Sequence, residues 1–121
     1  MQNAAAVVRP GGIIVLAASC REGFGNEAFQ RWANQGLNED ELLERYARGF
    51  VLGAHKAALA ARITKRCRVH LVSDLPPSSA KKLHFHPFTN MQEATEAALR
   101  LCKKESPDVA AVPYAGLTFF Y

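Results

Sequence analysis

The residues of this sequence most suited to chemistry lie in a glycine-rich loop, residues 19–26. Glu22, Gly23 and Gly25 fall in this loop, which follows the continuous apolar run 12–17, typical of a strand buried on both faces of a parallel sheet. Ligands of open α/β sheets bind beyond the carboxyl ends of such strands. The glycines would allow close backbone approach, and the N-terminus of the following helix could face an anion such as a carboxylate. The alternative is that the glycines only turn the chain.

The same loop contains a partial dinucleotide-binding pattern. The run Gly23-Phe24-Gly25-Asn26-Glu27-Ala28 fits G-x-G-x-x-A. In a true fingerprint the first glycine closes the turn straight after the strand, whereas here residues 19–22 intervene. The next predicted strand begins only near Arg68, too far for a compact βαβ unit of about 30 residues. The pattern therefore does not predict a dinucleotide site.

His55 and Lys56 open a second candidate position, the start of an alanine-rich helical stretch over residues 54–65. In the first turn of that helix both side chains can point beyond the edge of the sheet. A neutral histidine can there donate or accept a hydrogen bond. The alternative is a surface histidine at the start of a helix.

The remaining histidines and cysteines give weaker signals. His84 and His86 could share one face of a strand at a metal-ligand spacing, but no third ligand is evident and Pro87 follows at once. A position at the sheet edge is favoured over a metal site. His70 alternates within an apolar strand and is predicted to be packed. Cys20 lies near a predicted helix N-terminus, but no histidine near it in the sequence could act as its base. From these observations together, we expect no metal site and no catalytic group on this chain.

The elements that position these residues predict an α/β domain. Strands alternate with helical patterns, which favours a Rossmann-like three-layer fold with a mainly parallel sheet of about four strands, in an order that the sequence leaves open. The predicted strands are residues 12–17, 68–72, 83–85 and 109–112. The predicted helices are residues 26–34, 38–48 and 54–65, and one that begins after Asn90, with capping-box pairs at Asn38/Glu41 and Asn90/Glu93.

Composition and charge exclude several classes of protein. The 121 residues suffice for a single domain, 1–121, and 49% of them are hydrophobic. The net charge of +4 comes from short basic groups at element boundaries, so we expect no nucleic-acid partner. The longest apolar run, 11–18, is too short to span a membrane. Three cysteines without a C-x-x-C pair fit free thiols in the cytoplasm.

Both ends of the sequence look truncated. Residues 1–9 read as the last turns of a helix too short to be stable alone, and residues 117–121 form an apolar tail. The chain is therefore expected to be part of a larger protein. An exposed interdomain surface would favour self-association of the isolated chain.

Several short motifs together resemble a known family. They are Arg9-Pro10-Gly11-Gly12 with the apolar run after it, Cys20-Arg21-Glu22-Gly23-Phe24-Gly25, Gly53-Ala54-His55-Lys56, Ala61-Arg62, Val72-Ser73-Asp74 and Pro113-Tyr114-Ala115-Gly116-Leu117-Thr118. In this order and spacing they resemble the C-terminal domain of the nickel-dependent lactate racemase family, over almost the whole chain.

This resemblance implies a 2-hydroxyacid racemase or epimerase. In that family a nickel pincer nucleotide, bound by an N-terminal catalytic domain, takes part in hydride transfer at the α-carbon of the substrate. The present chain would then form one wall of the interdomain cleft through Glu22, Gly23, Gly25, His55 and Lys56, and would be inactive alone. The resemblance implies an aromatic residue where His55 stands, which puts lactate in doubt and favours a different or larger 2-hydroxy acid. The alternative function is a stand-alone Rossmann-like binding module without catalytic activity.

Overall fold

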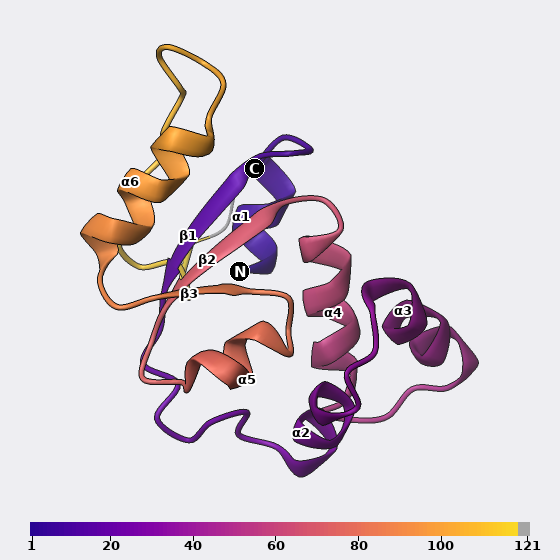
Figure 1. The fold of residues 1–121 in the computed structure, drawn as a ribbon. Helices are drawn as coiled ribbons and strands as arrows, with labels where there is room; N and C mark the ends of the chain where they lie inside the picture. Colours follow the sequence, from indigo (N-terminus) through magenta and orange to yellow (C-terminus); the bar gives the residue numbers. More distant parts are fainter. Residues whose placement is uncertain (119–121) are drawn as a thin grey trace.

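A three-stranded parallel sheet forms the centre of the chain. The computed structural model describes residues 1–118. Strands β1 (Ile13–Ala17), β2 (Arg68–Val72) and β3 (His86–Phe88) lie in the order β1-β2-β3 (Figure 1). Ile14 of β1 pairs with Val69 of β2, and His70 of β2 pairs with His86 of β3. The predicted α/β class with a parallel sheet is confirmed, and β2 is its central strand.

The structure has three strands where about four were predicted, and one of the three begins later than expected. Residues 109–112 form no strand, because this exposed apolar segment has no neighbouring strand to pair with. The strand predicted at 83–85 begins three residues later, at His86. The reason is the end of α5 (Pro77–Lys81), where the Phe85 N–H donates to the Ala80 carbonyl and His84 has a φ of 60°. Pro87 lies within β3 and is tolerated there because β3 is an edge strand.

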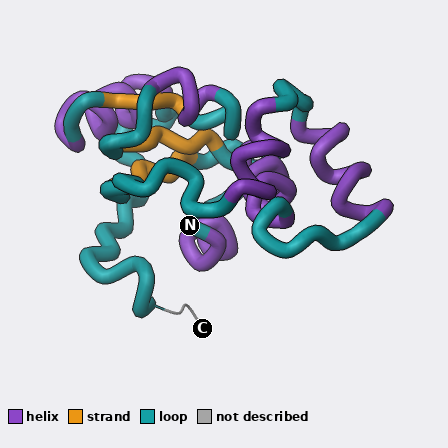
Figure 2. The backbone as a smooth tube through the Cα atoms, turned by 90° about the horizontal axis from the view of Figure 1, so that it is seen from below, coloured by secondary structure: helices purple, strands orange, loops and turns teal. Residues whose placement is uncertain are grey.

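Helices cover both faces of the sheet. Helix α4 (His55–Thr64) packs against β2, while α6 (Met91–Leu101) packs against all three strands. Figure 2 shows helices on both sides of the strands, and the short α1 (Gln2–Val7) lies against α4. The side chains of β2 alternate accordingly. Val69 and Leu71 enter the core that α4 shares, whereas the His70 ring on the other face contacts the Ala94 carbonyl of α6.

The long connection between β1 and β2 builds a second core on α4. Helices α2 (Glu27–Asn34) and α3 (Glu39–Arg48) contribute Trp32 and Leu42 to this cluster. Ala54, Ala57 and Ala61 of the α4 segment join it, because residues three and four apart lie on one face of a helix. Other α4 residues, Ala60 and Ile63, face the sheet core instead. The small alanine side chains therefore allow α4 to lie close to both packed layers.

The predicted helix caps are largely present. The Glu41 N–H donates to Asn38 Oδ1, and the Asn38 N–H donates to the Glu41 carboxylate, which completes the capping box. At the start of α6 the Glu93 N–H donates to Asn90 Oδ1, but the Glu93 carboxylate accepts from the Thr89 hydroxyl instead. The second capping box is thus half formed.

Residues 102–118 contain no helix or strand and extend away from the sheet. The Asn3 Nδ2 donates to the Thr118 carbonyl at 2.8 Å, so this segment returns to α1. Of the predicted apolar tail 117–121, residues 119–121 lie outside the described residues. Within residues 1–118, no helix is long and apolar enough to cross a membrane.

His70 offers a test of how α6 is held on the sheet. Its side chain is 1% exposed and Nδ1 lies 2.9 Å from the Ala94 carbonyl, which can only accept. We expect His70→Phe, which keeps the ring, to lower the free energy of unfolding by about 1 kcal/mol. His70→Ala should lower it by about 3 kcal/mol, because it also leaves a cavity. Urea denaturation measures both, with the exposed Thr95→Ala as control. Equal losses in the two His70 variants would contradict the expectation that the cavity, and not the lost hydrogen bond, causes most of the destabilisation.

Candidate functional site

The carboxyl edge of the sheet is closed by contacts between two loops. The Asp74 N–H after β2 donates to the Ser19 carbonyl after β1 at 3.0 Å. Arg21 Nε also lies 3.5 Å from Asp74 Oδ2, although both side chains are exposed and the pair adds little stability. The loop that contains Glu22, Gly23 and Gly25 is therefore fixed to the end of the central strand, as its position after β1 predicts.

The backbone of this loop turns twice in succession. The Gly23 N–H donates to the Cys20 carbonyl and the Gly25 N–H to the Glu22 carbonyl. Gly23 and Gly25 have φ values of 62° and 66°, and Cys20, with φ 49°, adopts a conformation that is unfavourable for a side chain. A Cβ on either glycine would meet no atom within 4 Å. The glycines therefore serve the turn, and they also leave Glu22 and the loop exposed.

The loop ends against the start of α4. Asn26 Oδ1 accepts a hydrogen bond from the Phe29 N–H and so caps α2. A Cβ on Gly53, which has φ 86°, would collide with the Asn26 amide group. Only glycine fits there for both reasons. The helix N-terminus that the sequence offers to an anion thus already holds Asn26, and the acidic Glu27 follows it.

His55 is oriented by its own turn. The Gly53 N–H donates to His55 Nδ1 at 3.1 Å, so the neutral ring carries its proton on Nε2. The Phe50 ring lies 5.2 Å from the imidazole between centroids, and Tyr46 lies 6.2 Å beyond Phe50. His55 therefore presents a hydrogen-bond donor, while the neighbouring Lys56 is exposed.

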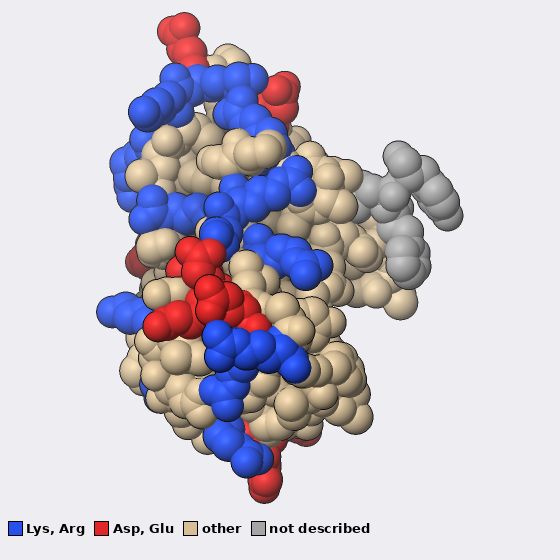
Figure 3. All heavy atoms as spheres, turned by 90° about the vertical axis from the view of Figure 1, so that its right-hand side faces the viewer, with Lys and Arg blue, Asp and Glu red and all other residues tan. Residues whose placement is uncertain are grey.

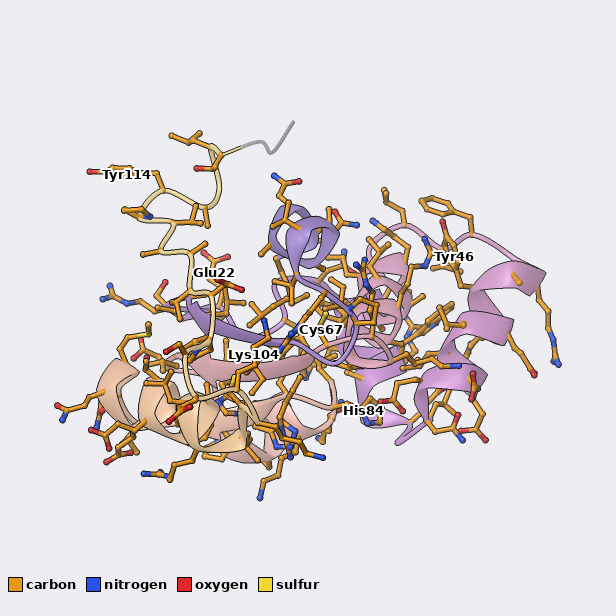
Figure 4. The ribbon with its side chains drawn as sticks, turned by 90° about the horizontal axis from the view of Figure 1, so that it is seen from above. Glu22, Tyr46, Cys67, His84, Lys104 and Tyr114 are labelled. Carbon is orange, nitrogen blue, oxygen red and sulfur yellow. The ribbon has the colours of Figure 1, made fainter. Side chains whose placement is uncertain are left out.

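The predicted site residues form two groups rather than one cluster. In Figure 4, Glu22 lies in the half of the molecule that holds Tyr114, whereas Tyr46, next to Phe50 in the stack that ends on His55, lies at the opposite end. The contact between Asn26 and Gly53 joins the groups. The structure thus extends the predicted site along the edge of the sheet.

The histidine pair at 84 and 86 does not share a strand face. His84 precedes β3, and its Nε2 lies 3.1 Å from the Leu37 carbonyl, while His86 opens the edge strand. Residues 1–118 contain no group of three or more His, Cys, Asp or Glu side chains that could hold a metal ion. Cys20, Cys67 and Cys102 are free thiols, and burial raises the pKa of the Cys67 thiol, with Arg66 opposing it. His70 is buried as predicted.

Sequence reasoning missed the contacts that hold the predicted site residues in place. Asn26 carries a signal, since an asparagine directly before a helical pattern predicts a cap. Asp74 carries another, because it follows the end of a strand. No local pattern predicts the contact of Gly53 with Asn26 or of Phe50 with His55, because these contacts depend on how α4 packs beside the loop.

The fold and the site define a Rossmann-like α/β domain with its candidate site at the carboxyl edge of a parallel sheet. The chain belongs to the lactate racemase C-terminal domain family, whose sequence model matches residues 1–119.

Two comparisons agree with this assignment. The chain is 26% identical over 106 residues to a lactate racemase of Thermoanaerobacterium thermosaccharolyticum, which is 84% of this chain and 25% of the relative. It also matches the structure of the lactate racemase apoprotein from the same organism, with a TM-score of 0.76 and 24% identity, over 85% of this chain and 26% of that one. The chain therefore spans about a quarter of the length of these relatives.

The contact between Gly53 and Asn26 can be tested by substitution. We expect Gly53→Ala to lower the free energy of unfolding by about 2–3 kcal/mol, because it combines a strained φ with displacement of the α2 cap. Gly23→Ala, where a Cβ meets open space, should cost only about 1 kcal/mol.

Urea denaturation of both variants, with Asn26→Ala and the Asn26→Ala/Gly53→Ala pair, completes the experiment. The double variant should cost clearly less than the sum of the single variants, because removal of the Asn26 amide relieves the collision. Simple additivity would contradict the contact.

Proposed function

We propose that this chain is the C-terminal domain of a nickel pincer nucleotide-dependent 2-hydroxyacid racemase or epimerase, and that it forms one wall of the substrate cleft. The observation that carries this proposal is the junction at the carboxyl edge, where the loop after β1 meets the start of α4 through Asn26 and Gly53. Membership of the family, together with a match that covers only 25% of the relative, supports an N-terminal catalytic domain as partner. The whole chain, 1–121, acts as one domain in this proposal.

Each candidate residue has a role that follows from its geometry. His55 donates from Nε2 to an oxygen of the substrate, since Nδ1 is already occupied. Lys56 supplies positive charge for the substrate carboxylate. Glu22, Gly23 and Gly25 line the exposed loop, where the backbone lies open to a ligand. Closure of the two domains would exclude water from the cleft and strengthen these contacts.

In this proposal the cofactor is bound by the N-terminal catalytic domain, as membership of the lactate racemase C-terminal domain family implies. When bound, the nickel pincer nucleotide supplies reversible hydride transfer at the α-carbon of the hydroxy acid. The residues of this chain bind and orient the substrate and carry no step of that transfer.

His55 also bears on the choice of substrate. An imidazole in place of the aromatic residue that the resemblance implies changes the hydrogen bonding of the cleft wall, because its Nε2–H is a donor at a different position. A site with such a donor favours a substrate that has an acceptor within its reach. We therefore propose a 2-hydroxy acid that is larger or more polar than lactate.

The test uses the full reading frame that encodes this domain, expressed with the nickel cofactor biosynthesis proteins. Nickel content and racemisation of a panel of 2-hydroxy acids are measured for wild type, His55→Ala and His55→Phe, with Thr95→Ala as control. We expect His55→Ala to lower kcat/KM by about tenfold, since it removes a hydrogen bond to the substrate. His55→Phe keeps a ring against Phe50 and restores an aromatic residue at this position. We therefore expect this variant to racemise lactate but not the larger or more polar substrate.

The outcomes separate the parts of the proposal. Nickel and racemisation with an unaffected His55→Ala variant would keep the family activity and remove His55 from the cleft. A protein that binds no nickel and turns over no substrate of the panel would overturn the proposal in favour of the stand-alone binding module.

A further inference from the structure

A basic groove lies at the amino edge of the sheet, opposite the candidate cleft. It has a volume of about 700 Å³ and lies between the end of α4 and the starts of β2 and β3. Its charged and imidazole side chains are those of Lys65, Arg66, Arg68, Lys81, His84, His86 and Glu39. Figure 3 views the molecule from the right-hand side of Figure 1 and shows many Lys and Arg side chains over the upper half, with a group of acidic side chains between these and further Lys and Arg side chains below.

The positive charge of the groove is only partly balanced. Lys65 pairs with Asp40, and the Arg66 guanidinium donates to the Val8 carbonyl, which leaves its charge uncompensated. Arg68 and Lys81 are exposed and have no ion-pair partner within residues 1–118. The groove thus offers several cationic donors to a ligand.

Two histidines line the same groove. Partial burial lowers the pKa of His86, because it disfavours the charged imidazolium. The charges of Arg68 and His70 lower this pKa further. His84 has a positive φ at a turn position that usually holds glycine, and its Nδ1 lies 3.9 Å from Glu39. The strained His84 thus lies beside the basic side chains of the groove.

We propose that this groove binds a multiply charged oxyanion of the phosphate class, such as a diphosphate group. With Lys65 already paired with Asp40, the two guanidinium groups and the Lys81 ammonium face Glu39 as the one carboxylate of the lining, which suits an anion with more than one charge. One guanidinium group binds a carboxylate or a phosphate through two parallel hydrogen bonds, but a diphosphate has enough anionic oxygens to engage both arginines, whereas a hydroxy acid has a single carboxylate. The groove is separate from the candidate cleft, so this proposal does not depend on the racemase function.

The experiment is an NMR titration of the 121-residue chain with inorganic pyrophosphate, against sodium chloride at matched ionic strength. A second titration with ADP shows whether a nucleoside adds to the binding of the diphosphate. The groove variant is Arg68→Gln/Lys81→Gln. The control variant, Arg31→Gln/Lys103→Gln, removes the same charge from exposed positions elsewhere.

We expect saturable shifts at residues 65–68 and 84–86, and a rise in the pKa of His86, because a bound anion stabilises the imidazolium. The groove variant should bind pyrophosphate about tenfold more weakly or worse, and the control variant should lose less than about twofold. Shifts without saturation, or equal weakening in both variants, would overturn the proposal, since general charge attraction would then suffice. Pyrophosphate shifts that map to the carboxyl edge would overturn it as well, because the anion would then bind in the candidate cleft.

Discussion

The parallel pairing of β1 with β2 governs the rest of this domain. Two parallel neighbours require the chain to return to the edge at which it began, and here it does so through α2, α3 and α4. Both strands consequently end at one edge, where the Asp74 N–H meets the Ser19 carbonyl. The last helix of the connection runs back beside the sheet, so its first residue, His55, lies towards that same edge.

The position of α4 then depends on its small side chains. A helix between a sheet and two other helices must approach both closely, and alanine at Ala57, Ala60 and Ala61 permits this on either side. Larger residues would separate the layers, because protein interiors are packed without free volume. Ala54 at the start of α4 is buried in the second core, and the hydrogen bond from the Gly53 N–H then orients the His55 ring.

The sequence predicted what depends on local chemistry and missed what depends on partners. The asparagine caps at Asn38 and Asn90 and the loop after β1 follow from short patterns, and the structure contains them. The segment 109–112 has the apolar character of a strand, but pairing requires a neighbour that no local pattern reveals. The contact between Asn26 and Gly53 joins residues far apart in sequence, so the site was predicted as residues and not as an arrangement.

The hydrogen bond from Asn3 to Thr118 joins the first helix to the far end of the described chain. Within this domain the ribosome makes α1 more than a hundred residues before Thr118. The helix is six residues long, and its partner α4 also follows well behind it. The earliest part of this domain to be synthesised is therefore among the last to acquire all of its native contacts.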